Sequence, residues 1–282
     1  MKTLAIDLGN FNIKTSESIS FNAQFKEGID TVSTERNLNF DNKDYIIEDG
    51  EWQFETDKVS KNYMPYLLYA IHKSTNENDI NLVLGVPINQ MGRKDKLISE
   101  LKDKTFKFTI GDINREITIH KIAVVAEGYS SLFTLPDSVR SNDILLLDIG
   151  GGTINVLTYS NKKIIDRDTM PFGMFSFYNS LEERFVAEGK ETDKKNIERL
   201  LDKNKIPFDI EPYKDVLVDR IVNRLKDKKI DYTTYDIYVT GGGSLRLNSA
   251  LIRKLGMVTP VPNPLFSNCL GNLNIANTQW GE

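Results

Sequence analysis

Two short segments of the chain each place an aspartate and a glycine-bearing turn directly after an apolar run. They are residues 6–14, IDLGNFNIK, and residues 147–155, LDIGGGTIN. Backbone N–H groups of such turns can hold phosphate oxygens, and aspartate carboxylates are suitable ligands for Mg²⁺. If the two turns face each other, they can hold one nucleoside triphosphate between them. The pair therefore predicts a site for ATP or GTP with Mg²⁺, and hydrolysis of that nucleotide.

The first turn combines a carboxylate, a glycine and an amine. Asp7 ends the apolar run, and Gly9 permits a tight turn with close backbone approach. Lys14 lies across the expected hairpin, where its ammonium could reach the β- or γ-phosphate. A common Asp-x-Gly turn followed by an exposed strand lysine fits this segment equally well. The residues expected to bind nucleotide here are Asp7, Gly9, Asn10, Phe11, Asn12 and Lys14.

Two further glycine turns follow apolar runs. Three consecutive glycines come after Asp148. Glycines cost backbone entropy on folding, and close contact with phosphate is a good reason for three of them here. Another three stand between an expected strand and helix, where N–H groups at the helix start can pack against ribose and the α-phosphate. A plain hairpin loop and a simple strand–helix turn are the alternatives, but three such turns in one chain favour a shared ligand. The residues expected to bind nucleotide are Gly150, Gly151, Gly152, Thr153, Gly241, Gly242, Gly243 and Ser244.

Glu127 follows an apolar run and precedes an expected helix. A carboxylate at this point could orient the water that attacks the γ-phosphate, acting with Mg²⁺. It could instead be a helix N-terminal residue favoured by the helix dipole, and spacing alone favours this second explanation. The candidate catalytic residues are therefore Glu127 and Asp148, and the candidate metal ligands are Asp7 and Asp148.

The pattern of apolar residues predicts the elements that position these turns. Short apolar runs alternate with amphipathic segments, and the arrangement restarts near residue 143, which predicts an α/β protein of two lobes. The first lobe is expected to comprise residues 1–134 and 265–282, with a small β-rich outer part at about 21–60. The second is expected to comprise residues 135–264. Strands are expected at residues 2–8, 13–20, 81–86, 106–110, 116–119, 122–125, 143–148, 153–159, 163–169 and 236–240.

Helices and one tight hairpin complete the expected framework. Asp49 and Gly50 stand between alternating residues and predict a hairpin over 45–54. A helix is expected to begin near residue 63, with Pro65 in its first turn. Further helices are expected at about residues 91–104, 128–135, 174–185, 192–202, 213–225, 244–255 and 268–273.

Composition narrows the class of protein. The formal net charge of −4 argues against broad, direct binding of nucleic acid. No run approaches the length of apolar sequence that crosses a membrane, and no signal peptide is recognisable, so a cytoplasmic protein is expected. The single cysteine, Cys269, excludes an internal disulfide. His72 and His120 lie far apart, and packing is a better explanation for them than metal binding.

Taken together, the segments resemble the five motifs of the actin-like ATPase superfamily. The two phosphate loops would be residues 7–14 and 148–153, the two connecting helices 124–129 and 263–271, and the adenosine motif 240–244. The resemblance implies a two-lobed, ribonuclease H-like fold with the nucleotide in the cleft between the lobes. It also implies that Asp7 and Asp148 flank Mg²⁺ and that Glu127 positions the hydrolytic water.

Within the superfamily, the chain resembles bacterial plasmid-segregation actins of the ParM kind, on residues 84–87 (LGVP) and 170–173 (MPFG). The segment between Asp148 and Gly241 is short, so the outer lobe of the second half is expected to be reduced or missing. This loss resembles the AlfA type. Because that lobe normally helps to hold the adenine, Arg199 or Lys203 is expected to compensate.

The resemblance implies a protein that polymerises into head-to-tail filaments with ATP or GTP, hydrolyses the nucleotide, and moves plasmids. A DNA-binding adaptor on a plasmid centromere would be the partner, with no direct DNA binding and no membrane contact. The alternative is a small-molecule kinase, because residues 4–12 (LAIDLGNFN) also resemble the opening of type III pantothenate kinases. A third hypothesis is a non-catalytic scaffold or a membrane-linked relative of the shape-determining actins, although no amphipathic anchor helix is visible at either end.

Overall fold

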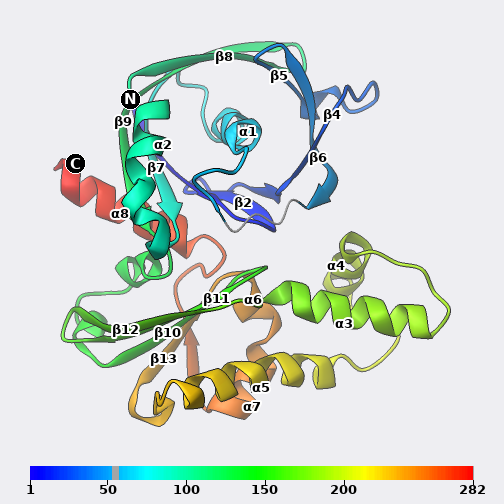
Figure 1. Cartoon of the computed structure of the whole chain (residues 1–282), viewed down its shortest axis with the longest axis vertical. Coiled ribbons are helices and arrows are strands. Elements are labelled where there is room, and N and C mark those ends of the chain that lie inside the picture. The colour runs from blue at the N-terminus through cyan, green and yellow to red at the C-terminus, as the bar shows by residue number, and fades with distance from the viewer. Residues whose placement is uncertain (53–56, 282) are drawn as a thin grey trace. The chain divides into compact units, whose positions relative to one another are not determined.

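A computed structural model describes residues 1–52 and 57–281 of the chain. Contacts between residues divide it into two compact units, shown in Figure 1. Unit 1 comprises residues 1–135 and 266–282, and unit 2 comprises residues 136–265. Residues 53–56 and 282 lie outside the described residues. The first of these segments falls within the predicted outer part and at the end of the predicted hairpin.

Unit 1 is built on one large mixed sheet. Its strand order is β3-β2-β1-β7-β9-β8-β5-β6-β4, with β1, β7 and β9 parallel to one another and the other neighbours antiparallel. The described elements are β1 (Lys2–Leu8), β2 (Asn12–Thr15), β3 (Ser20–Asn22), β4 (Gln24–Glu27), η1 (Thr34–Arg36), β5 (Asn37–Phe40), β6 (Lys43–Trp52), α1 (Met64–Ser74), β7 (Asp79–Val86), η2 (Ile88–Arg93), α2 (Lys94–Leu101), β8 (Lys104–Ile110), β9 (Ile113–Ala126), η3 (Ser130–Thr134) and α8 (Ser267–Trp280).

The sheet curls around α1, which runs through its concave side (Figure 1). Every residue of α1 from Pro65 to Ile71 is buried, and the helix contacts β1, β2, β5 and β6. The C-terminal end of α1 is held by Arg115, whose guanidinium donates to the backbone carbonyls of Thr75 and Glu77. The other side of the central strands is covered by α8, which contacts β1 and β7. Burial on both faces explains why β1 and β7 read as continuous apolar runs.

Several expectations for unit 1 were wrong in their local geometry. The strand expected at 13–20 is two paired strands, β2 and β3, joined by a turn. Asp49 and Gly50 make no hairpin turn, because β6 continues through them to Trp52 and they lie in an irregularity of its pairing with β4. The tight turn is at Asp41 and Asn42, both with positive φ, between β5 and β6. The strands expected at 116–119 and 122–125 are one long strand, β9, and the helix expected at 128–135 is the short 3-10 helix η3.

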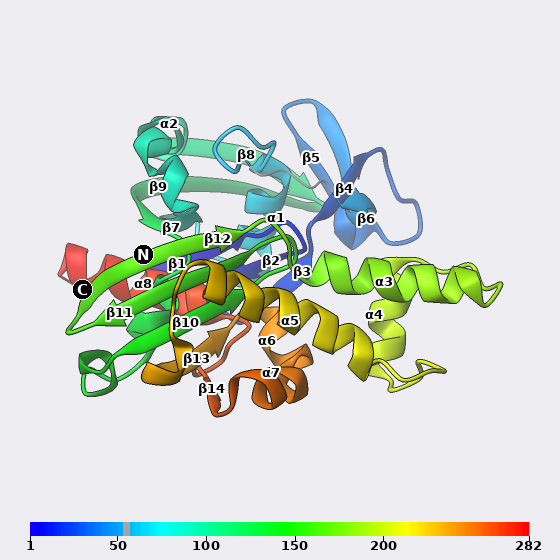
Figure 2. The same ribbon diagram turned by 60° about the horizontal axis from the view of Figure 1, so that its bottom comes forward.

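Unit 2 contains a five-stranded sheet of order β12-β11-β10-β13-β14, in which β10, β13 and β14 are parallel. Helix α7 contacts β14, α5 contacts both α3 and α7, and α3 extends beyond the ends of the strands in Figure 2. The described elements are η4 (Val139–Ser141), β10 (Ile144–Ile149), β11 (Ile154–Ser160), β12 (Lys163–Met170), α3 (Met174–Ala187), α4 (Lys194–Asp202), α5 (Glu211–Asp227), η5 (Tyr232–Thr234), β13 (Asp236–Thr240), α6 (Gly242–Arg246), α7 (Asn248–Leu255) and β14 (Val258–Pro260).

The segment between α3 and α5 is short. In unit 2, all of whose residues are described, α4 is the only helix or strand between these two helices. Its N-terminus is capped by Asp193, whose carboxylate accepts from the backbone N–H of Asn196. A single helix therefore stands where the sequence predicts a reduced or missing outer lobe. Among the helices of the described ranges, none has the length and apolar content needed to cross a membrane.

The close approach of α8 to η3 gives a test of this packing. A Cβ at Gly271 would lie 1.8 Å from the carbonyl oxygen of Ser130, whereas a Cβ at Gly92 meets no atom within 4 Å. We expect Gly271→Ala to lower the free energy of unfolding by about 1–3 kcal/mol or more, because neither backbone can give way easily. Alanine is a better helix former than glycine by about 1 kcal/mol, so a loss of stability would be caused by the clash and not by helix propensity. Urea unfolding of both variants measures this, and equal stability of Gly271→Ala and Gly92→Ala would contradict the packing.

Candidate functional site

The first predicted turn lies at the end of β1, an interior strand of the unit 1 sheet. Asp7, next to last in β1, is 9% exposed and stands opposite Lys14 of β2, with 3.7 Å between its Oδ2 and Lys14 Nζ. Gly9 is required by the turn, because a Cβ there would lie 2.4 Å from the carbonyl oxygen of Asn12. The side-chain oxygen of Asn12 is buried and has no hydrogen-bond partner within the described part of the chain. The turn thus holds a carboxylate, an ammonium and an unsatisfied acceptor.

Glu127 is joined to Asp7 by a lysine that sequence reasoning missed. It directly follows β9, and its backbone N–H donates to the carbonyl of Val86 at 2.7 Å. Lys58 Nζ lies 2.6 Å from Glu127 Oε1 and 3.5 Å from Asp7 Oδ1. A Cβ at Gly85 would lie 3.0 Å from Glu127 Cγ, so the glycine leaves space for this carboxylate. The residues predicted for metal binding and for catalysis in unit 1 are therefore in one charge network.

Burial and ion pairing have opposite effects on the pKa values of Asp7 and Lys58. Burial raises the pKa of Asp7, but the ammonium groups of Lys58 and Lys14 lower it, and the pKa lies below its ordinary value. Burial likewise lowers the pKa of Lys58, whereas the carboxylates of Glu127 and Asp7 raise it well above its ordinary value. Asp7 and Lys58 therefore each stabilise the charged form of the other at neutral pH.

A second missed lysine extends the network along the turn. Lys61 is 6% exposed, and its Nζ lies 3.4 Å from the carbonyl oxygen of Gly9 and 3.4 Å from Asn10 Oδ1. The same ammonium lies 5.0 Å from the ring centroid of Tyr66, which is fully buried. Together with Lys14 and Lys58, this places three ammonium groups near Asp7.

An aromatic pair fixes the tip of the first turn. The ring of Phe11 stacks on Trp52 of β6 with centroids 5.1 Å apart and an interplanar angle of 10°. Trp52 Nε1 also donates to the carbonyl oxygen of Phe11 at 3.0 Å, and the same carbonyl accepts from the backbone N–H of Ala23. The turn is thus tied to the strands that follow it in sequence.

In unit 2, Asp148 occupies a position like that of Asp7 in unit 1. It is next to last in β10, is 7% exposed, and stands opposite Thr240, the last residue of β13. Gly241 follows with φ 79°, and a Cβ there would lie 2.7 Å from Asp148 Oδ1 and 2.5 Å from the carbonyl oxygen of Ile149. The third glycine turn therefore packs directly on the aspartate of the second, and only glycine allows this contact.

The second turn is held on the N-terminus of α3. The carbonyl oxygens of Gly150 and Gly151 accept from the backbone N–H groups of Met174 and Phe175 at 3.0 and 2.8 Å, and Gly150 donates to the carbonyl of Thr153. Gly173 enables this contact, because a Cβ there would lie 2.5 Å from the Gly150 oxygen.

The third turn opens α6. Ser244 is buried, and its hydroxyl donates to the carbonyl oxygen of Gly241 at 2.7 Å. A Cβ at Gly243 would lie 2.4 Å from the side chain of Ile149. Gly242 has more room, since a Cβ there would meet Leu265 at an ordinary 3.5 Å. Unit 2 thus brings together the predicted residues of its own two turns.

A polar cluster adjoins α6. The Arg246 guanidinium pairs with the carboxylate of Asp202 on α4 and also bonds Tyr178 of α3. Burial raises the pKa of Glu198, also on α4, and Asp202 raises it further, although Arg246 lowers it. Arg199, expected to compensate for the missing lobe, is exposed and bonds Asn196 of its own helix. The guanidinium beside the third turn is therefore that of Arg246, two residues after Ser244.

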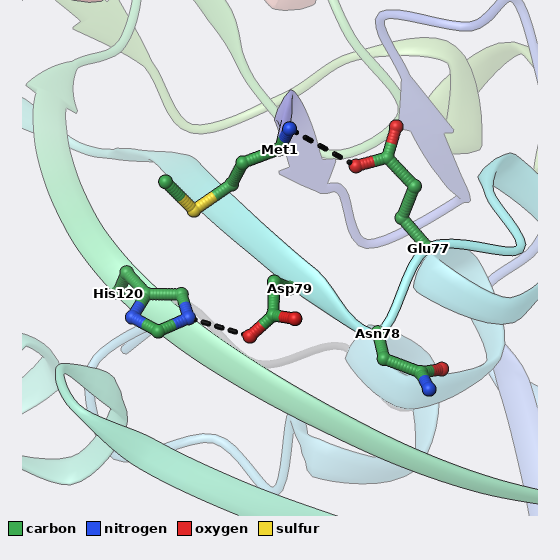
Figure 3. A pocket seen from close by; sticks show the side chains of 5 residues that line it. All are labelled: Met1, Glu77, Asn78, Asp79 and His120. Carbon is green, nitrogen blue, oxygen red and sulfur yellow. Dashed lines mark hydrogen bonds and ion pairs between the residues drawn. The ribbon is translucent and has the colours of Figure 1, made fainter.

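A pocket on unit 1 lies away from the predicted residues (Figure 3). It is lined by Met1, Glu77, Asn78, Asp79 and His120, and His120 Nε2 lies 2.6 Å from Asp79 Oδ1. His72 instead lies beside the Arg115 guanidinium, at 3.4 Å. Both histidines thus have polar neighbours.

The comparisons with known proteins agree with this geometry. Residues 5–129 match the family model of the actin-like proteins N-terminal domain, a segment that contains the first turn, both missed lysines and Glu127. No curated protein matches the chain.

Solved structures match over nearly the whole chain. The archaeal actin homologue Ta0583 is similar with a TM-score of 0.84 and 16% identity, covering 99% of this chain and 100% of its own. A non-polymerisable mutant of pCBH ParM gives 0.77 and 21%, with 99% and 100% covered. AlfA from B. subtilis plasmid pLS32, solved as a filament, gives 0.66 and 20%, with 96% and 97% covered.

These similarities confirm the predicted fold class, because two mixed α/β units of this kind match actin homologues from end to end. Residues 5–129 thus match the actin-like N-terminal domain, and the chain has the actin-like fold over its whole length.

Proposed function

We propose that this chain is a nucleotide-dependent actin-like protein that polymerises with ATP or GTP and hydrolyses it. One observation carries the proposal: the chain has two aspartates at strand ends, and each lies beside a glycine-bearing turn. Asp7 stands in a network of lysines, and Asp148 stands under the Gly241 turn. Both lie in a chain with the actin-like fold.

The carboxylates suit a magnesium nucleotide. Asp7 and Asp148 are each hard oxygen donors of the kind that Mg²⁺ prefers, and a bound Mg²⁺ would neutralise charge that develops during phosphoryl transfer. The buried oxygen of Asn12 is an acceptor that a metal-bound water could satisfy. Lys14, Lys58 and Lys61 supply positive charge to the phosphates at short range.

Glu127 is the candidate for positioning the attacking water. Its carboxylate is held by Lys58 at 2.6 Å, which orients it. In this proposal Lys58 is a positioning residue for Glu127 and a cation for the phosphate. In unit 2, Arg246 follows the Ser244 turn and interacts with Glu198, and both are candidates for contacts with the base and ribose.

Assembly is proposed from the relatives. Among the matched structures are an AlfA filament bound to AMPPNP and an ADP complex of Ta0583. By the same reasoning, we propose that the chain forms a filament in the cytoplasm. There it would segregate plasmid DNA through a DNA-binding adaptor, which fits its net charge of −4.

The first test is assembly. We expect wild-type protein to form sedimentable filaments, visible in negative stain, when Mg-ATP or Mg-GTP is added. Asp7→Asn and Asp148→Asn should each abolish nucleotide binding and assembly, because each loses a metal ligand. Asp103→Asn is the control, since Asp103 is exposed and has a φ of 55° that asparagine tolerates. Turnover that requires an added hydroxyl acceptor would instead support a kinase.

The second test separates binding from hydrolysis. Glu127→Gln should lower the single-turnover rate of phosphate release by about 10²-fold while nucleotide affinity stays within a few-fold, because the amide cannot accept the proton of water. Glu116→Gln on the outer part of β9 is the matched control. Loss of affinity equal to the loss of rate would show that Glu127 only binds nucleotide.

The third test uses the two tryptophans as reporters. Because Trp52 stacks on Phe11 of the first turn, we expect its fluorescence to change when Mg-nucleotide binds. Trp52→Phe should remove the signal, and Trp280→Phe, which changes the C-terminal end of α8, should retain it. A signal that follows Trp280 would place the nucleotide-linked change elsewhere.

A further inference from the structure

Asn272 of α8 is a buried amide beside the candidate site of unit 1. Its side chain is 1% exposed, and its Oδ1 has no hydrogen-bond partner within the described part of the chain. A buried amide oxygen of this kind is costly, because it has given up its hydrogen bonds to water. A leucine or phenylalanine at the same position of the helix would avoid this cost. The amide therefore calls for a role other than packing.

Gly85 of β7 marks the place of the Asn272 side chain. A Cβ at Gly85 would lie 3.2 Å from Asn272 Nδ2 and 3.3 Å from Glu127 Oε1. Both contacts are tighter than usual for a Cβ, so the two groups are this close only because position 85 has no side chain. The amide nitrogen of Asn272 and the carboxylate of Glu127 thus border the same small space over the glycine.

Helix α8 is fixed at this end of the unit 1 strands by polar contacts on both sides of Asn272. The Cys269 thiol, one turn earlier, donates to the carbonyl oxygen of Lys14 at 3.3 Å. The Ser130 hydroxyl, in the segment that follows β9, donates to Asn268 Oδ1 at 3.4 Å. The first half of α8 is therefore held against β2 and against the segment that begins after β9, which fixes the backbone that carries Asn272.

Two other buried amides of unit 1 show what a structural use looks like. Gln24 and Asn81 also have a side-chain oxygen without a partner in the described ranges. Their nitrogens nevertheless hold the fold together, since Gln24 donates to the carbonyl of Gly50 at 2.7 Å and Asn81 donates to the hydroxyl of Thr3 at 3.5 Å. The nitrogen of Asn272 instead lies next to a carboxylate of the candidate site.

The carboxylate of Glu127 needs a donor besides Lys58 if it is to accept a proton from water. Lys58 lies 2.6 Å from Glu127 Oε1, and in the proposed function the same ammonium also serves the phosphate. An ammonium beside a carboxylate lowers the basicity of the carboxylate, whereas a neutral amide can orient it with a smaller effect. An amide donor is therefore the better partner for the base once the lysine turns toward the nucleotide.

We propose that Asn272 is a positioning residue for Glu127: with nucleotide bound, its Nδ2–H donates to the Glu127 carboxylate and keeps it aimed at the attacking water. The inference rests on the proposed function and deepens it, because it adds a residue of α8 to the hydrolytic site. Asn272 acts through Glu127 and does not touch the phosphates, so it should affect the rate of hydrolysis and leave nucleotide binding unchanged.

A leucine at position 272 separates this role from packing. Asn272→Leu removes the amide and fills the buried position, so the free energy of unfolding in urea should stay equal or rise. The single-turnover rate of phosphate release should fall about tenfold, with nucleotide affinity within a few-fold, because Glu127 loses a donor that orients it. Asn277→Leu is the matched control and should hydrolyse at the wild-type rate. Asn277 lies on the same helix, and its side-chain oxygen is likewise buried without a partner in the described residues.

The pH dependence gives a readout that packing alone would not move. Asn272→Asp places a second carboxylate beside Glu127, in a network that already holds Lys58, Asp7 and Lys14. A like charge favours the protonated form of Glu127, so the rising limb of the hydrolysis rate against pH should move to higher pH. An unmoved limb would contradict the proposed contact.

A double variant shows whether Asn272 acts through Glu127. Glu127→Gln combined with Asn272→Leu should be no slower than Glu127→Gln alone, and a further tenfold loss would exclude this route. Wild-type turnover by Asn272→Leu, or equal losses of rate and affinity, would overturn the inference and leave the proposed function intact. Wild-type protein that binds or hydrolyses no nucleotide would overturn both.

Discussion

The unit 1 site depends on compensation of buried carboxylates by lysine. An isolated carboxylate at the end of a central strand would cost several kcal/mol, and removing one partner of such a pair leaves that cost uncompensated. Lys58 is 2.6 Å from Glu127 and 3.5 Å from Asp7, and Lys14 approaches Asp7 from the neighbouring strand. The parallel strands β1, β7 and β9 end together, which brings the groups that need compensation to one edge of the sheet.

In unit 2 the close contacts around the second turn are made by glycine. Gly241 lets the backbone approach Asp148, and Gly173 lets it approach Gly150 and Gly151, closer than any side chain would permit. Their turns are fixed by hydrogen bonds to the start of α3 and by the packing of α6. This difference explains why the glycine turns of unit 2 were so visible in the sequence, while the lysines of unit 1 were not.

The sequence predicted the strands, the two-unit α/β class and the turns, because these depend on local patterns of apolar residues and glycine. It did not predict Lys58 or Lys61, which stand in an aperiodic polar segment and reach the site only through tertiary folding. The hairpin turn predicted at Asp49 and Gly50 was wrong for a related reason. These two residues lie in an irregularity of the pairing between β4 and β6, and Asp41 and Asn42 form the hairpin turn. The residues beside α6 were likewise found only from the packing of three helices, although Arg246 follows the third turn closely in sequence.

The outer strands of unit 1 connect the first turn to the loop of residues 28–36. Trp52 stacks on Phe11 and lies on β6, and β6 pairs with both β4 and β5, the strands that flank this loop. A displacement of Phe11 would therefore act on a strand that is hydrogen-bonded to both ends of the loop. If the nucleotide sets the conformation of the first turn, these strands give it a route to the outer part of the sheet. A nucleotide can shift the equilibrium between two conformations of the turn only by as much as its affinities for those conformations differ. Through the contact between Phe11 and Trp52, a change in the conformation of the turn would reach the outer strands.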